Sequence, residues 1–316
     1  MQFRIPAALV AAATLAAGCG GNKPAAPGAP VPTTATKKIG VTLLGRTDPF
    51  YQEMEKAMLA EAKLKGMELD VQDGNRDLST QLAQVETFIS QKKDALILCP
   101  VDSDGIGGAV EKANAAGIPV FTADIKANKG KVITHVASDN VKGGELAGER
   151  LAKLLNGKGK VVIIDYPSVA SVRERTAGFA KAVAKFPGIQ IVERPNGKAK
   201  RDEALNQTET MLQKYPDLAG VFAINDNTAL GALKAITNSK RANVILIGYD
   251  GDPEARTAIL AGTALKADAV QYPAKIGKQT IDVIDAHFRG EKTPAYAPVE
   301  VGLIDQDSLK KEPTAK

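Results

Sequence analysis

From Lys38 onward, short apolar segments alternate with longer segments that have helical spacing. The apolar segments are Ile39–Leu44, Met67–Gln72, Ala95–Leu98, Ile118–Phe121, Val161–Ile164, Ile189–Val192, Gly220–Ile224 and Val244–Ile247. The amphipathic segments between them include Phe50–Lys65, Leu78–Lys92, Ser168–Phe186, Glu203–Lys214 and Thr228–Asn238. Short apolar strands that alternate with helices are typical of parallel sheets covered on both faces. Two rounds of the pattern predict an α/β protein with two doubly wound lobes.

The length and charge of the chain agree with this organisation. A chain of 316 residues is long enough for two lobes with separate cores. The net charge of +5 is small and evenly spread, and no run of Lys and Arg is interleaved with aromatic residues. The sequence therefore argues against a nucleic-acid partner.

The N-terminal segment resembles a bacterial lipoprotein signal. Arg4 precedes the apolar stretch Ile5–Ala17, which is too short to span a bilayer. The stretch runs into Leu15-Ala16-Ala17-Gly18-Cys19, which resembles a lipobox, although that pattern prefers Leu where Ala16 stands. We expect residues 1–18 to be a signal peptide, with cleavage before Cys19 and lipidation of its thiol. The alternative is an ordinary signal peptide that releases a soluble protein.

Residues 19–37 predict a flexible tether. Gly20 to Lys37 is rich in Pro, Ala, Gly and Thr and has no apolar periodicity, so burial cannot offset the entropy of ordering it. The expected protein is thus exported and anchored to the membrane by lipid. If Cys19 is lipidated, Cys99 has no partner for an internal disulfide.

Polar and aromatic residues follow the predicted strands. In open parallel sheets, ligands bind at the carboxyl ends of the strands, near helix N-termini. Carboxylates and amides suit hydroxyl groups, arginine suits paired oxygens, and an aromatic face suits the C–H side of a sugar ring. The alternative for each such residue is a helix cap or turn, which we favour for Asp102 and Asp226. The segments concerned are Arg46–Tyr51, Cys99–Asp102, Ala123–Ile125, Asn225–Asn227 and Tyr249–Asp252.

Enzymatic function is disfavoured by what the sequence lacks. The chain has only two histidines, His135 and His287, and it contains neither a phosphate-binding loop nor a Gly-x-Ser-x-Gly elbow. His135 lies in an apolar run and is expected to be structural. The sequence predicts no catalytic residue, no cofactor and no metal site.

From about Lys38 to Val301 the chain resembles the ribose-binding group of type I periplasmic sugar-binding proteins, which serve ABC transporters. The order and spacing of many short matches carry this resemblance, because no single piece is specific. The matches are Asp48-Pro49-Phe50-Tyr51, Val101-Asp102-Ser103-Asp104, Ala137-Ser138-Asp139-Asn140 with Gly143-Gly144, Arg173-Glu174-Arg175 with Gly178-Phe179, Asn225-Asp226 with Ala229-Leu230-Gly231-Ala232, Gly248-Tyr249-Asp250-Gly251 and Gln271-Tyr272-Pro273.

The resemblance implies two lobes joined by a three-segment hinge. The chain is expected to cross between lobes near Ser138–Asp139, Gln271–Pro273 and Val299–Glu300. The N-terminal lobe would then comprise residues 38–138 plus 272–299, and the C-terminal lobe residues 139–271 plus 300–316. Such a hinge lets the lobes close as rigid bodies around a ligand.

The resemblance also implies a ligand-binding set, carried over position by position: Asp48, Phe50, Tyr51, Cys99, Asp124, Arg175, Asn225, Tyr249, Asp250 and Gln271. Alternatives remain for four of these residues. Phe50 and Tyr51 fit the core at a helix start, Arg175 fits a surface helix charge, and Cys99 fits a small buried residue at a strand end.

Departures from the ribose-type pattern bear on the ligand. That pattern has Asn at the positions of Asp48 and Cys99, Arg at the position of Ile125, and an aromatic residue near Lys198–Ala199. Loss of an arginine removes a rigid set of donors, and loss of an aromatic removes a stacking wall. Carboxylates at Asp48, Asp124 and Asp250 would face mainly Arg175, with help from Lys198. We expect a neutral sugar or polyol other than ribose, or a sugar that bears an amino group.

The function implied is delivery of this solute to an ABC-transporter permease by a monomeric binding protein. An alternative is a sensor that presents its closed form to a membrane receptor, which the sequence does not separate from transport. A sugar-responsive repressor shares the fold but carries an N-terminal helix-turn-helix, and here a signal peptide and tether occupy that place.

Overall fold

The computed structural model describes residues 36–312. The predicted signal peptide and the lipidation site Cys19 lie outside these residues, as does almost all of the predicted tether. Lys37, the last residue assigned to the tether, is the first residue of strand β1.

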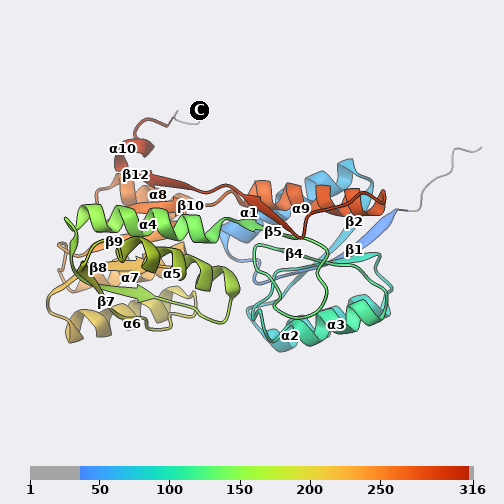
Figure 1. Cartoon of the computed structure of the whole chain (residues 1–316), viewed down its shortest axis with the longest axis horizontal. Coiled ribbons are helices and arrows are strands. Elements are labelled where there is room, and N and C mark those ends of the chain that lie inside the picture. The colour runs from blue at the N-terminus through green and yellow to red at the C-terminus, as the bar shows by residue number, and fades with distance from the viewer. Residues whose placement is uncertain (1–35, 313–316) are drawn as a thin grey trace, which may run out of the picture. The chain divides into compact units, whose positions relative to one another are not determined.

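The first lobe is built on a six-stranded sheet with strand order β11-β5-β4-β3-β1-β2, and all of its pairs are parallel. Helices α1 and α9 pack together on one face, and α2 and α3 cover the other (Figure 1). The bounds are β1 (Lys37–Leu43), β2 (Met67–Asp73), β3 (Ala95–Leu98), β4 (Val120–Ala123), β5 (His135–Ser138), β11 (Tyr296–Val299), α1 (Pro49–Leu64), α2 (Leu78–Ser90), α3 (Gly107–Ala115) and α9 (Pro273–Phe288).

Strand β3 shows why the first sheet needs helices on both faces. All of its residues are buried. Leu96 and Leu98 belong to the same hydrophobic cluster as Phe88 of α2, whereas Ile97 belongs to the cluster of Met54 of α1, because successive side chains point to opposite faces. A fully apolar strand of this kind is stable only between two helical layers.

The second lobe is built on a six-stranded sheet with strand order β12-β10-β9-β8-β6-β7. Only β12 is antiparallel to its neighbour among these pairs. The bounds are β6 (Lys158–Ile164), β7 (Gly188–Glu193), β8 (Leu218–Ala223), β9 (Ile245–Asp250), β10 (Leu265–Val270), β12 (Gly302–Asp305), α4 (Asn140–Leu154), α5 (Ala170–Val183), α6 (Arg201–Lys214), α7 (Asp226–Asn238), α8 (Pro253–Leu260) and α10 (Gln306–Leu309).

Helices α4 and α5 pack unusually closely through glycines. A Cβ atom added at Gly144 would lie 2.0 Å from the carbonyl oxygen of Arg175, and one added at Gly178 would lie 2.0 Å from that of Val141. These distances are far below van der Waals contact, so only glycine allows the two backbones to approach this closely. The contact fixes the position of α5, which carries Arg175.

The predicted fold class is confirmed, with one departure at the edge strand β12, which runs antiparallel. Between Lys37 and Leu309 the chain passes from one sheet to the other after β5, after β10, and between β11 and β12. The periodicity did not predict several elements, including β5, β10, α4 and α9. No helix of the described part is both long and apolar enough to cross a membrane.

Candidate functional site

A cavity of about 50 Å³ opens where the carboxyl ends of the parallel strands of both sheets meet. This is room for a few water-sized groups. Eight of the ten residues predicted to bind a ligand line it: Asp48, Phe50, Tyr51, Asp124, Arg175, Asn225, Asp250 and Gln271. Since these residues come from both lobes, the cavity joins the two halves of the described chain.

Arg175 is a buried cation held by its neighbours. Its side chain on α5 donates from Nε to Asn140 Oδ1 at 2.9 Å and from Nη1 to the Ile224 carbonyl oxygen at 2.8 Å. The guanidinium lies over the Tyr249 ring, with 4.0 Å between Cζ and the ring centroid. Arg175 is 5% exposed, so the surface-charge alternative is wrong. An arginine fixed in this way is preorganised to bind oxygen atoms.

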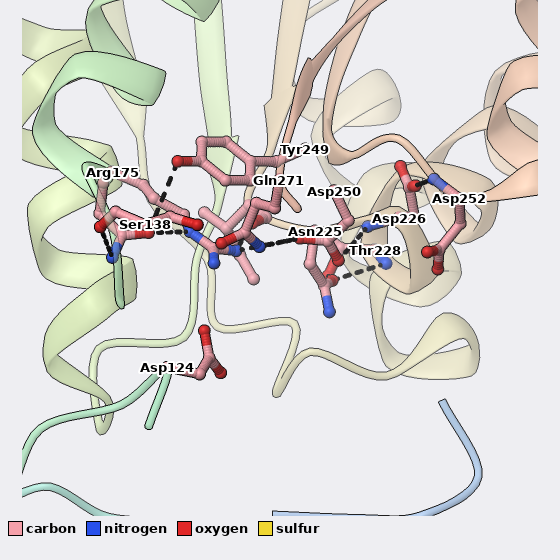
Figure 2. A network of polar contacts seen from close by, with 12 residues as sticks. Asp124, Ser138, Arg175, Asn225, Asp226, Thr228, Tyr249, Asp250, Asp252 and Gln271 are labelled. Atoms are coloured by element: carbon pink, nitrogen blue, oxygen red, sulfur yellow. Dashed lines mark hydrogen bonds and ion pairs between the residues drawn. The ribbon is translucent and has the colours of Figure 1, made fainter. Parts of the chain in front are cut away.

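Asp250 and Gln271 form a second part of the site, next to Arg175 (Figure 2). Asp250 Oδ1 accepts from Gln271 Nε2 at 2.6 Å and lies 3.4 Å from Arg175 Nη1. Burial raises the pKa of Asp250 well above its ordinary value, and the charge of Arg175 opposes this shift. Gln271 Oε1 is buried, and none of residues 36–312 donates a hydrogen bond to it. The pair therefore has an acceptor to offer to a ligand.

Asp124 follows β4, on the side of the cavity that belongs to the first lobe. Its Oδ2 accepts from the Tyr51 hydroxyl at 2.7 Å, and its Oδ1 is buried without a donor among the residues that the structure describes. In Figure 2 its carboxylate stands apart from the Arg175–Asp250 network and faces it. Burial raises the pKa of Asp124, while the charge of Arg175 and the Tyr51 hydrogen bond lower it. Asp124 and Arg175 thus line one cavity from opposite lobes.

Asp48 is engaged by two neighbours that the sequence analysis did not single out as site residues. Arg76, from the turn between β2 and α2, forms an ion pair with Asp48 Oδ2. Asn227, near the start of α7 in the other lobe, donates from Nδ2 to Asp48 Oδ1 at 2.9 Å. Arg76 and Asn227 also line the cavity. Asp48 therefore connects the lobes as well as facing the cavity.

Asn225 is both a helix cap and a cavity residue, the two alternatives that the sequence left open. It is the N-cap of α7, and its Oδ1 accepts from the Thr228 N–H at 3.0 Å. Because the amide oxygen is occupied by this cap, the Nδ2 donors remain available to a ligand, and Asn225 lines the cavity. Asp226, which we expected to be a cap, is instead the first residue of the helix and is fully buried.

Tyr249 and Cys99 do not line the cavity. Tyr249 is fully buried beneath Arg175, so its ring supports the guanidinium. Cys99 is fully buried in the core of the first lobe, and burial raises the pKa of its thiol well above the ordinary value. Lys198 is also absent from the lining and pairs with Glu203 at 2.9 Å, whereas Ala199 lies on the cavity wall.

The two predicted aromatic residues serve the core and the cavity together. Phe50 and Tyr51 lie in the first turn of α1, are each 6% exposed, and pack edge to face with 5.2 Å between ring centroids. Both belong to the hydrophobic core of the first lobe and both line the cavity. The core and ligand-contact alternatives are therefore compatible.

Sequence reasoning missed further lining residues, among them Tyr166, Ser171, Asp252 and Arg76. Asp252 had a signal, since it follows β9 in the segment that drew attention to Asp250. No sequence pattern pointed to Arg76, because it lies in a turn and has a φ of 53°. This left-handed conformation is not one that a sequence pattern predicts for arginine.

The arrangement suits non-covalent binding of a polar solute. Acceptors without donors stand at Asp124 and Gln271, while charged or amide donors stand at Arg175, Arg76 and Asn225. A hydroxyl group can satisfy both kinds of partner, since it donates and accepts. Within residues 36–312 no cluster of His, Cys, Asp and Glu has an arrangement that could hold a metal ion.

Comparisons with known proteins agree with this geometry. The chain is 40% identical over 255 residues to the ribose import binding protein of Bacillus subtilis, covering 80% of this chain and 82% of that protein. A solved ABC-transporter solute-binding protein from Mycobacterium smegmatis, with bound glycerol, is 34% identical with a TM-score of 0.82, covering 87% of this chain and 96% of the other.

A second solved structure, a periplasmic solute-binding protein of an ABC transporter from Actinobacillus succinogenes with bound D-allose, is 29% identical. Its TM-score is 0.80, and the match covers 88% of this chain and all of that one (100%). Residues 39–292 match the family described as the periplasmic binding protein domain. This chain belongs to the periplasmic binding protein family.

Proposed function

We propose that this protein binds a monosaccharide or a related polyol in the cavity between its lobes and delivers it to an ABC-transporter permease. The observation that carries the proposal is the pair of buried acceptors on opposite sides of one cavity. Asp124 Oδ1 and Gln271 Oε1 are both buried, and no residue of the described part of the chain donates to them. Buried acceptors are ordinarily paired, so each requires a donor from the bound solute.

Donors on the same walls support a ligand rich in hydroxyl groups. Arg175 and Asn225 present N–H groups, and an alcohol oxygen can accept from them while its hydrogen satisfies a carboxylate. The Phe50 and Tyr51 rings add apolar surface suited to the C–H face of a small ring. Ligands of relatives, namely ribose, glycerol and D-allose, belong to this chemical class.

Within this class we propose a ligand other than ribose and without an anionic group. Four carboxylates line the cavity, at Asp48, Asp124, Asp250 and Asp252, against two arginines, Arg76 and Arg175. Arg76 is committed to Asp48, and Ile125 and Ala199 contribute only apolar surface. An excess of acidic groups favours hydroxyl or amino groups over a phosphate or carboxylate.

The test is a panel of D-ribose, D-allose, xylitol, myo-inositol, glycerol and D-glucosamine, measured by thermal shift and then by calorimetry. A ligand at a hundredfold excess over its Kd stabilises the folded protein by about 2.7 kcal/mol, which gives a measurable rise in Tm. If no sugar or polyol raises the Tm, the proposed function is wrong. If ribose binds best, the class is right and the proposed selectivity is wrong.

We also propose that the N-terminal lobe comprises residues 38–138 plus 272–299 and the C-terminal lobe residues 139–271 plus 300–316. The chain would act as a monomer. A lipid on Cys19 would hold it to the membrane. The sequence Leu15-Ala16-Ala17-Gly18-Cys19 supports the lipid attachment. The test expresses the natural chain and Cys19→Ser and separates membrane from soluble fractions. The natural chain is expected in the membrane fraction and the variant in the soluble one. Equal partition of both would contradict lipid anchoring.

A further inference from the structure

Two fully buried carboxyl groups, those of Asp226 and Asp268, lie within hydrogen-bonding reach of each other beneath the loop that carries Asp250. Asp226 begins α7 and Asp268 lies in β10, and both are 0% exposed. Within residues 36–312, no group in hydrogen-bonding geometry donates to three of their four oxygens, namely Asp226 Oδ1 and both oxygens of Asp268. A Cβ atom added at Gly248 would lie 2.1 Å from Asp268 Oδ1, so glycine at that position leaves room for this carboxyl group.

The fourth oxygen holds the backbone of the loop. Asp226 Oδ2 accepts from the Asp252 N–H at 2.6 Å, and the Asp226 N–H points back to Asp250 Oδ2 at 3.5 Å (Figure 2). Gly251, between these two aspartates, has φ of 82°, and Asp250 itself has φ of 122°. A backbone in such a conformation costs free energy and persists only when its surroundings hold it. The hydrogen bond from the Asp252 N–H to Asp226 is one of the interactions that hold this backbone.

We propose that Asp226 and Asp268 share one proton and that this carboxyl pair positions the Asp250 side chain for ligand binding. The proposal rests on the proposed function, since Asp250 belongs to the candidate sugar site. A carboxyl group that keeps its proton donates to the second carboxylate, and this bond satisfies two of the three oxygens that otherwise have no partner. Two bare carboxylates at this depth would repel each other and distort the loop.

The charges around the pair favour this protonation. Burial raises the pKa of Asp268 to about 7, with Asp252 acting in the same direction and Asp226 and Arg256 against it. Burial also raises the pKa of Asp226 well above its ordinary value, with Asp268, Asp250 and Asp252 adding to the shift. Arg256 of α8 is a cation that offsets the acidic groups at Asp268, and Arg175 has the same effect on Asp250.

The proposal predicts how binding depends on pH. Below the pKa of the pair the shared proton is present and the loop is held; above it both groups ionise, and the loop loses its position. The affinity for a sugar that binds in the panel should therefore fall at least about threefold between about pH 5.5 and about pH 8.5, on either side of the pKa of Asp268. Asp268→Asn supplies a permanent donor to Asp226, so its affinity should stay level.

The experiment measures calorimetric affinities of the full chain, Asp268→Asn and Asp217→Asn at both pH values. Asp217 is an exposed carboxylate paired with Lys160, so its variant should keep the wild-type profile. A merely structural role of Asp268 would change the affinity equally at both pH values. If Asp268→Asn retains the wild-type fall in affinity, or if the wild-type affinity does not fall, the positioning role is wrong.

A second measurement does not depend on any sugar. The infrared difference between the ligand-free full chain and Asp268→Asn at about pH 5.5 should contain the C=O band of one protonated carboxyl group, since Asp226 ionises beside the amide. Absence of this band overturns the shared proton, and Asp226→Asn repeats the test if the first variant does not fold. Failure of the whole sugar panel with the band present would reject the proposed function and the positioning role while leaving the shared proton in place.

Discussion

Asn227 and Asp48 lie 179 positions apart in the chain and are joined by a hydrogen bond of 2.9 Å from Asn227 Nδ2 to Asp48 Oδ1. The two residues belong to different lobes, so the bond exists only while the lobes are close. Arg76 holds the second carboxylate oxygen of Asp48, on the side of the first lobe. The contact therefore stabilises the closed arrangement without requiring the ligand.

Asn227→Ala should weaken ligand binding. The variant removes a hydrogen bond to a charged acceptor that only the closed form makes, a loss of about 1.5–3 kcal/mol or roughly 10- to 150-fold in affinity. Asn206→Ala, at an exposed position on α6, is the matched control and should bind like the wild type. Unchanged calorimetric affinity in Asn227→Ala would show that the interlobe bond contributes nothing to closure.

Arg175→Lys should weaken binding even though the charge is kept. Lysine cannot bond Asn140 and the Ile224 carbonyl together while facing the cavity, because it lacks the planar fork of arginine. We expect a loss of roughly 1.5–3 kcal/mol, which is about 10- to 150-fold in Kd. Arg201→Lys, at a surface ion pair with Glu254, makes the same exchange as a control and should leave the Kd unchanged. A wild-type Kd in Arg175→Lys would remove Arg175 from the site.

The stability of the protein should fall in acid because of His135. Burial lowers the pKa of His135 from 6.5 to about 4, and the charge of Lys126 adds to the shift. The unfolded chain therefore binds more protons than the folded protein between these values, and stability is lost as pH falls from 6.5 to about 4. The loss reaches about 3 kcal/mol by the size of this shift.

His135→Gln should remove the loss of stability that His135 causes in acid, as measured by urea denaturation at several pH values. The buried carboxyl pair of the second lobe acts with the opposite sign, so the difference between variant and wild type is the quantity to compare. Above pH 7 the two proteins should show the same slope. An equally steep acid decline in the variant would mean that His135 is charged in the folded protein.

Gly144→Ala should destabilise the protein, because its Cβ would meet the Arg175 carbonyl oxygen at 2.0 Å. Such overpacking typically costs about 1–3 kcal/mol, and the displacement of α5 should also weaken ligand binding. Gly108 of α3 has nothing within 4 Å of an added Cβ, so Gly108→Ala should be neutral or stabilise the fold by about 0.5–1 kcal/mol. Equal Tm values for the two variants would contradict the close packing of α4 and α5.

The sequence predicted the candidate site best where a strand end decides the position. Asp124 and Asn225 follow buried strands and Asp250 ends one, and parallel strands bring their carboxyl ends to one edge, so periodicity is enough to group these residues. What periodicity cannot decide is the direction of a side chain at a strand end. Tyr249 and Asp250 are adjacent, yet the first lies beneath Arg175 and only the second lines the cavity.

Arg76 illustrates what local pattern could not reveal. Its turn, Asp73-Gly74-Asn75-Arg76-Asp77, has the composition of an ordinary loop. Both Asn75 and Arg76 adopt left-handed backbone conformations, and Arg76 lies against Asp48. The partner of Arg76 lies in a different loop, so the pairing depends on tertiary structure. Strand β5 likewise depends on tertiary structure, since on one side it pairs with β11, which lies far away in the sequence.

The passage of the chain between sheets has a consequence for folding during synthesis. Strand β11 completes the first sheet beside β5, and β12 completes the second beside β10. Neither sheet is therefore complete until the residues beyond 295 have been synthesised. A nascent chain that ends before β11 leaves the β5 edge open to unwanted pairing. Long segments separate β5 from β11 and β10 from β12, so these strand pairings form late and slowly. Truncation of the chain before β11 should therefore leave both halves aggregation-prone.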